Sequence, residues 1–492
     1  MMKIEKIVFW GGLILGLICH AVTLPYSPVH WQDECQITEL GRLLLSPGTD
    51  WSMCILPTSI TELGGNGIWN IGKTLQELSY RLGGAPAPRW MELFCLVTVA
   101  ILVRFYVAKK TSSAWLGTVF GLLAFSVPGL VQSARGARVD AMAMMFLFAA
   151  LSVMQIEDCP CGKNRRPLVM ALTGACAALC VWTWATAVMM MPIVLWEFVE
   201  TLRRWRVNMR ELFTLLGCVV VGGLLISAID FIPCYESIRG TLARIGNSSK
   251  AVGYGQESSF GRTVAQLFAF PGLYVIGFCC LFVRRRFWLL AVAAAAFLYV
   301  TKGSIYVFRT LYLMPYALIG FALLSGMIRC TWVKRSLVVI AVLMLAVTYA
   351  RSVVVRNAVE FLAREYRDGR TLKAVLAKEI GRGALVYNCA FQTYYVGREL
   401  DWKQYQMFYD ALRPDVAKIK DLDYFLIDAN DVENVSLDDL RLAGFDKHRT
   451  IAVFPPPAQG VHKWLAQHGR LHSLGDYVLF YRSGSFCRPS SD

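Results

Sequence analysis

The sequence predicts an α-helical polytopic membrane protein with about eleven transmembrane helices and a small C-terminal α/β extracytoplasmic domain. Composition is the first reason: hydrophobic residues make up 56% of the 492 residues and charged residues 17%, whereas soluble domains average about 45–50% and about 25%. Long apolar runs separated by short basic clusters are the second reason. The mean hydropathy of +0.46 therefore indicates apolar surface that faces lipid.

Apolar runs of roughly the length of a bilayer crossing, about 20 residues, mark the predicted spans. The spans are residues 7–24, 91–108, 114–132, 139–156, 168–184, 186–201, 212–232, 264–283, 287–301, 310–328 and 336–354. The fifth and sixth together form one apolar stretch that is too long for a single helix, so we interpret it as a hairpin.

Basic clusters give the orientation of these spans. They are Lys3/Lys6, Lys109/Lys110, Lys163/Arg165/Arg166, Arg203/Arg204/Arg206/Arg210, Arg284/Arg285/Arg286 and Arg329/Lys334/Arg335. The span map puts all of them on one side, and cytoplasmic loops carry an excess of Lys and Arg. We therefore expect a multi-pass protein of the cell inner membrane, with a cytoplasmic N-terminus and an extracytoplasmic C-terminal domain.

Two domains follow from this map. Residues 1–354 form the transmembrane domain, which includes an extracytoplasmic loop at 25–90 with helix-like stretches at 34–45 and 68–82. Residues 355–492 alternate strand-like runs (ALVYN, YFLID, TIAVF, YVLFY) with polar helical stretches at 370–380, 436–443 and 461–468, as in an α/β domain.

The net charge of +15 does not indicate a nucleic-acid partner, because the cations lie in separate loops and backbone neutralisation needs a continuous basic face. Among the 15 cysteines, Cys35 with Cys54 and Cys389 with Cys487 could form disulfides in an oxidising compartment.

An acidic pair, Asp33 and Glu34, follows the first span in the segment HWQDECQITELGR. Adjacent carboxylates repel each other and tend to raise one pKa, which suits a general base. The alternative is structural, because acidic residues also stabilise the first turn of a helix.

Two further groups of charges are predicted on the outer side, against the positive-inside trend. Arg135, Arg138 and Asp140 lie where the third span ends and the fourth begins, and Lys302, Arg309 and Tyr312 lie before and at the start of the tenth. Fixed cations there suit a phosphate group, to which Arg can bind through two oxygens. The alternatives are an interfacial Arg–Asp pair and an aromatic belt with cations that extend to the interface.

These residues resemble the GT-C glycosyltransferases that use polyprenyl-phosphate sugars, in particular the protein O-mannosyltransferase and lipid A aminoarabinose transferase group. The similar features are the acidic motif Trp31-Gln32-Asp33-Glu34, the motif Arg138-Val139-Asp140 and, loosely, the basic and Tyr-Pro-containing segment 302–316.

The resemblance implies an inverting transfer of a sugar from a polyprenyl-phosphate donor to a glycan, lipid or protein acceptor. It implies that Asp33 is the general base, that Glu34 orients the acceptor, and that Arg138 and Asp140 shape the site from the opposite side, with Asp140 as a catalytic residue. Arg135, Arg138 and Tyr312 are expected to bind the substrate. Lys302 and Arg309 would stabilise the leaving phosphate. No cofactor is required, and Mg²⁺ or Mn²⁺ at Asp33 and Glu34 is an open alternative.

Two other functions fit the same charges. A transporter or flippase for a lipid-linked substrate would use the cations to guide an anionic lipid and would need no base, although the lack of an internal repeat argues against it. A non-enzymatic assembly or sensor protein would use residues 355–492 to bind a partner.

Overall fold

The structure is a computed structural model that describes residues 2–26, 32–46, 70–156, 165–232, 272–283, 288–295, 311–328, 330–405, 419–454, 460–467 and 475–483. The chain divides into two compact units. The first comprises Met1–His20, Gly67–Gly72 and Arg89–Arg356, and the second comprises Ala21–Asn66, Lys73–Pro88 and Asn357–Asp492. The sequence-based division at residue 354 stays a prediction of membrane topology.

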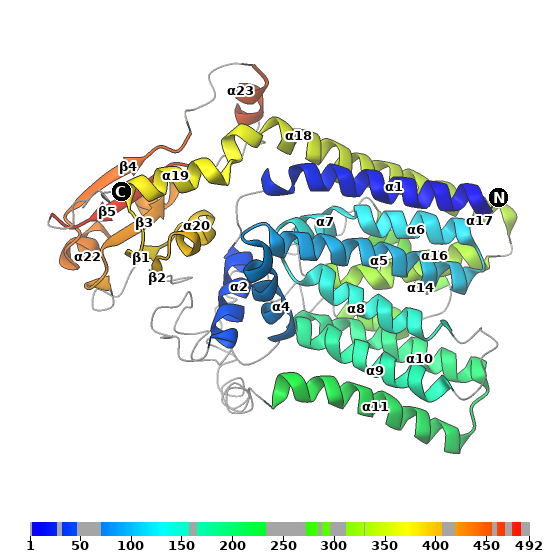
Figure 1. Ribbon diagram of the computed structural model, residues 1–492. Helices are drawn as coiled ribbons and strands as arrows, with labels where there is room; N and C mark the ends of the chain where they lie inside the picture. Colours follow the sequence, from blue (N-terminus) through cyan, green and yellow to red (C-terminus); the bar gives the residue numbers. More distant parts are fainter. Residues whose placement is uncertain are drawn as a thin grey trace. The chain divides into compact units, whose positions relative to one another are not determined.

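The first unit is a bundle of apolar helices (Figure 1). They are α1 (Met2–Thr23), α5 (Ala87–Thr111), α6 (Ala114–Ser126), α7 (Pro128–Arg135), α8 (Asp140–Val153), α9 (Arg166–Thr183), α10 (Met191–Trp205), α11 (Met209–Phe231), α14 (Leu273–Val283), α16 (Met314–Met327) and α17 (Thr331–Tyr349). A π-helical segment, Ala350–Val355, continues α17.

Among the described residues, five helices are long and apolar enough to cross a membrane. They are Ile4–Tyr26, Ala87–Thr111, Arg166–Thr183, Met209–Ile229 and Thr331–Leu362. The pair α6 and α7, bent by 52°, would make a sixth, and three shorter apolar helices accompany them. All the predicted spans overlap helical residues. The chain is thus a multi-pass helical membrane protein, and the number eleven stays a prediction.

Glycines allow the helices of the bundle to approach closely. A Cβ on Gly174 of α9 would lie 2.0 Å from the backbone oxygen of Val219 in α11, and one on Gly222 would lie 1.9 Å from that of Ala171. Small residues at helix contacts are typical of packing in membranes, where close backbone approach replaces the hydrophobic driving force. Helix α11 also exposes Phe213 and Leu225, each at 66%, as expected for a surface in contact with lipid.

Buried polar clusters join the helices at the end of the bundle that holds the start of α1. Glu5 of α1 is paired with Arg104 of α5 at 2.9 Å and also accepts a hydrogen bond from Thr118 of α6. Glu197 of α10, with a fully buried side chain, lies 2.6 Å from the ammonium of Lys110. Buried charges of this kind need such partners, because an unpaired charge in a low-dielectric interior is costly.

The second unit contains a five-stranded mixed sheet in the order β2-β1-β3-β5-β4. The strands are β1 (Leu385–Asn388), β2 (Lys403–Tyr405), β3 (Tyr424–Asp428), β4 (Lys447–Ile451) and β5 (Tyr477–Tyr481). Strand β1 pairs in parallel with β2 and β3, while β5 pairs antiparallel with β3 and β4. Four of the strands contain or overlap the predicted runs, and the short β2 was not predicted.

Helices cover both faces of this sheet. Helices α19 (Gly369–Glu379) and α22 (Leu437–Leu442) lie on its two faces, and α20 (Tyr394–Glu399), α23 (Gly460–Gln467) and most of α18 (Arg356–Leu362) also belong to this unit. Leu376 of α19 packs in one buried cluster with Leu426 of β3, and Leu440 of α22 packs in another with Phe425. The alternation of strand residues between two apolar layers is the expected pattern for a sheet covered on both sides.

Two helices from the predicted first loop, α2 (Gln32–Leu45) and α4 (Asn70–Gly83), also belong largely to the second unit. They correspond to the predicted helical stretches 34–45 and 68–82. Gly41 lets them pack closely, since a Cβ there would lie 2.1 Å from the backbone oxygen of Lys73.

Candidate active site

The α7–α8 turn of the first unit carries the predicted Arg135, Arg138 and Asp140. Pro128 starts α7, and Gly136 follows its last residue. Ala137 then takes a left-handed conformation with φ of 47°, which is unusual for a residue with a side chain. The amide of Arg138 donates back to the carbonyl of Ser133 at 3.0 Å. This compact turn places Asp140 in the first turn of α8, where the helix dipole favours an acidic residue.

Asp140 is the centre of a buried hydrogen-bond cluster. Its Oδ2 accepts from the Ser133 hydroxyl at 2.6 Å and from Nε of Arg138 at 2.8 Å. Its Oδ1 accepts from the hydroxyl of Tyr312 at 2.5 Å. Both carboxylate oxygens are thus occupied by protein donors, and the residue is only 1% exposed. The carboxylate is therefore suited to fixing the Arg138 guanidinium and the Tyr312 ring in place.

Two polar contacts that sequence reasoning missed lie beside this turn. The fully buried Arg135 donates from Nη1 to Nδ1 of His20, at the end of α1, at 2.9 Å. Glu92 of α5, also fully buried, accepts at 3.2 Å from the amide of Met142 in the first turn of α8. A histidine and a glutamate within apolar runs were the only signals available in the sequence.

The carboxylates Asp33 and Glu34 lie in the first turn of α2, in the second unit. The Glu34 side chain is fully buried, and its backbone oxygen accepts from the Thr38 hydroxyl at 2.9 Å. The side chain of Asp33 is outside the described part of the structure. Convergence of these carboxylates with Arg138 and Asp140 is a prediction.

The other predicted residues are placed only in part. Tyr312 joins the Asp140 cluster, but Lys302 and Arg309 lie outside the described residues. So do Cys54 and Cys487, so both disulfides stay predictions. Within the described ranges no group of three or more His, Cys, Asp or Glu side chains could hold a metal ion, and a metal at Asp33 and Glu34 stays an untested alternative.

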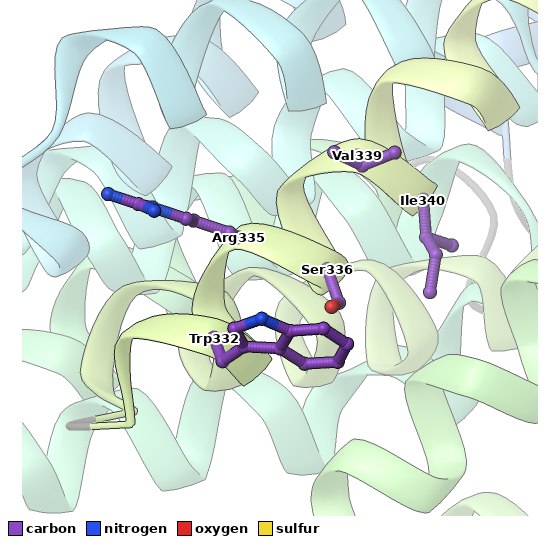
Figure 2. A pocket seen from close by; sticks show the side chains of 5 residues that line it. All are labelled: Trp332, Arg335, Ser336, Val339 and Ile340. Atoms are coloured by element: carbon purple, nitrogen blue, oxygen red, sulfur yellow. The ribbon is translucent and has the colours of Figure 1, made fainter.

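A surface groove of about 320 Å³ lies elsewhere in the first unit, on α17 (Figure 2). Its lining residues all come from the first half of that helix and are Trp332, Arg335, Ser336, Val339 and Ile340. None of them is a predicted site residue. The groove has one charged side chain and no carboxylate, so it lacks the acid–base groups of the predicted site.

The helical bundle and its charged turn define the class of protein: a multi-pass membrane protein whose fold is shared with known structures. One similar structure is ArnT from Cupriavidus metallidurans in the apo state, with a TM-score of 0.54 and 14% identity over 95% of this chain and 97% of that one. Another is the same protein bound to undecaprenyl phosphate, with a TM-score of 0.53 and 13% identity over 97% and 98% of the two chains.

These two neighbours support a GT-C fold for this chain. At this level of identity the likeness shows the fold alone. No family model matches the sequence, and no curated protein matches it.

Proposed function

We propose that this chain is an integral membrane glycosyltransferase that moves a sugar from a polyprenyl-phosphate donor to an acceptor hydroxyl on the extracytoplasmic face of the inner membrane. The observation that carries the proposal is a fold shared along nearly the whole chain with ArnT, which has been crystallised with undecaprenyl phosphate. The acceptor is a glycan, a lipid or a protein. The Arg138–Asp140 cluster supports the proposal, because it supplies a fixed cation next to the start of an apolar helix.

The transfer is a single displacement. Asp33 takes the proton of the acceptor hydroxyl, and the acceptor oxygen forms a bond to the anomeric carbon. The bond from that carbon to the phosphate oxygen breaks, its electron pair stays on the phosphate, and the configuration of the anomeric carbon inverts. Glu34 orients the acceptor. A general base in this role contributes about 10²–10⁴-fold to the rate.

The cationic residues stabilise the leaving polyprenyl phosphate, on which negative charge develops. Arg138, Lys302 and Arg309 have this role, and Asp140 with Tyr312 holds the Arg138 guanidinium in a fixed orientation. Preorganised charges stabilise a transition state more than mobile ones, because they need no reorganisation during the reaction. Removal of one such group typically lowers the rate by about 10²–10³-fold.

The test uses purified protein in liposomes that contain undecaprenyl-phosphate sugars of hexose, pentose and aminopentose types, with released undecaprenyl phosphate as the readout. Mass spectrometry of envelope glycans and lipids from cells with and without the gene identifies the sugar and the class of acceptor to add to the liposome assay. We expect Asp33→Asn to lower turnover by about 10²–10⁴-fold and to leave undecaprenyl phosphate binding unchanged.

Asp401→Asn is the matched control, because Asp401 is 72% exposed in a surface ion pair with Arg382. It should keep full turnover. A flippase would be indicated by a different result: neither the wild type nor Asp33→Asn releases undecaprenyl phosphate, and both still move the lipid across the bilayer. An unchanged set of glycoconjugates in the cells would also contradict the proposal.

A further inference from the structure

The short helix α20 connects the sheet of the second unit to α2, the helix that begins with the predicted catalytic carboxylates. The Tyr394 hydroxyl donates to Oε2 of Glu39 at 2.7 Å. The hydroxyls of Tyr395 and Thr38 lie 3.0 Å apart. One turn earlier, the Cys35 thiol donates to the carbonyl of Phe391 at 3.3 Å.

A second set of contacts joins α20 to α4. Arg398 makes a two-pronged hydrogen bond to the Glu77 carboxylate, at 2.7 and 3.0 Å. The side chain of Glu77 is fully buried and that of Arg398 is 14% exposed. The guanidinium also lies 3.8 Å from the ring centre of Tyr80. Two-pronged pairs of this kind fix direction as well as distance.

Helices α2 and α4 pack directly on each other, so both sets of contacts act on α2. Gly41 of α2 leaves no room for a side chain against Lys73 and Glu77 of α4. The ring of Tyr80 on α4 stacks on Tyr395 of α20, with ring centres 5.3 Å apart. The three helices therefore form one packed group. Within it, α20 lies between strands β1 and β2 in the chain and so ties the group to the sheet.

Two phenols in this contact, Tyr394 and Tyr80, have raised pKa values. Burial raises the pKa of Tyr394 well above its usual range, and the neighbouring Glu39 carboxylate raises it further. Burial also raises the pKa of Tyr80. Both phenols thus stay protonated, and Tyr394 remains a donor to Glu39.

We infer that α20 positions the first turn of α2 for catalysis, with Tyr394 and Arg398 as positioning residues for Asp33 and Glu34. Glu39 follows Asp33 by six residues, or about 9 Å along a helix, so a shift at this anchor moves the carboxylates. The inference rests on the proposed function. It makes the chain after residue 357 part of the catalytic machinery and not a separate partner-binding module.

The experiment compares Arg398→Met with Arg382→Met in the full-length protein in liposomes. Arg382 belongs to the same sheet domain, but its ion pair is 72% exposed. For Arg398→Met we expect kcat to fall by about 10–100-fold, since a displacement near 1 Å can cost about 10²-fold, with an unchanged KM for the undecaprenyl-phosphate sugar. Arg398→Lys should recover part of kcat, because it restores the charge without the two-pronged geometry.

Two further measurements separate positioning from misfolding. The stoichiometry of undecaprenyl phosphate binding reports the folded fraction and should equal that of the wild type. Amide hydrogen exchange in residues 32–40 should be faster in Arg398→Met and unchanged in Arg382→Met. If Arg398→Met fails to fold, Tyr394→Phe removes a single oxygen and tests the same anchor by the same readouts.

Equal kcat and equal exchange in Arg398→Met and the wild type would overturn the inference. So would equal losses in Arg398→Met and Arg382→Met. A wild-type protein that consumes no sugar donor would overturn the proposed function and the catalytic consequence of the anchor. The exchange measurement would then still decide whether Arg398 holds α2 in place.

Discussion

Replacement of Asp140 by Asn tests the cluster that fixes Arg138. Oδ2 of Asp140 accepts two hydrogen bonds, from Ser133 and Arg138, and Oδ1 accepts one, from Tyr312. Asparagine keeps one accepting oxygen. This oxygen satisfies the most donors when it faces Ser133 and Arg138. Its NH₂ group then faces the Tyr312 hydroxyl, so the hydrogen bond from Tyr312 to a charged acceptor is lost and only a weaker neutral one, from the amide to the phenol oxygen, can replace it.

The cost follows from these contacts. A hydrogen bond to a charged group contributes about 1.5–3 kcal/mol, and Arg138, only 11% exposed, also loses its counter-charge. We therefore expect Asp140→Asn to lower the free energy of unfolding by about 2–4 kcal/mol. The assay is reversible unfolding in mixed detergent micelles, followed by tryptophan fluorescence as the fraction of denaturing detergent increases.

Tyr312→Phe provides the internal comparison, since it deletes the hydroxyl that donates to Oδ1. Because Asp140→Asn already removes this bond, the double variant should cost less than the sum of the single variants by about 1–2 kcal/mol. Additive costs would refute the argument. So would a free energy of unfolding for Asp140→Asn within about 0.5 kcal/mol of the wild-type value.

Two further predictions use the same unfolding assay. Glu197→Leu leaves the ammonium of Lys110, 16% exposed, without its carboxylate and should lower the free energy of unfolding by about 3–5 kcal/mol. Its control is Glu200→Gln, since Glu200 pairs with an arginine that is 71% exposed. This control should lower the free energy of unfolding by less than about 1 kcal/mol. Gly222→Ile should force α11 away from α9 and cost at least about 1–3 kcal/mol, whereas Gly217→Ile, with nothing within 4 Å of an added Cβ, should not. Equal costs within either pair would contradict the corresponding packing.

The sequence predicted the features of the fold that depend on local periodicity. Apolar runs located the helices, and alternating runs located β1, β3, β4 and β5, although β4 begins three residues earlier than the run TIAVF. Strand β2, with three residues, is too short to give a pattern.

The residues of the candidate site were predictable only where basic side chains lay on the predicted outer side, against the positive-inside trend. Arg138 and Asp140 stood out because positive charge is disfavoured on the outer side, and the structure brings them together with Tyr312. The contact of Arg135 with His20 joins residues 115 positions apart, and that of Arg398 with Glu77 joins residues 321 positions apart. Contacts at such separations come from tertiary packing and leave no periodic signal in one sequence.

The buried carboxylate of Glu197 has a consequence for biosynthesis. Its partner Tyr106 lies 91 residues earlier in the chain, so α5 is synthesised well before α10. An unpaired charge in a low-dielectric interior is costly, and Lys110, in the last turn of α5, lacks the Glu197 carboxylate until α10 has been made. The lateral assembly of α5 is therefore coupled to the arrival of α10, and a chain truncated between these helices should leave α5 exposed to quality-control proteolysis.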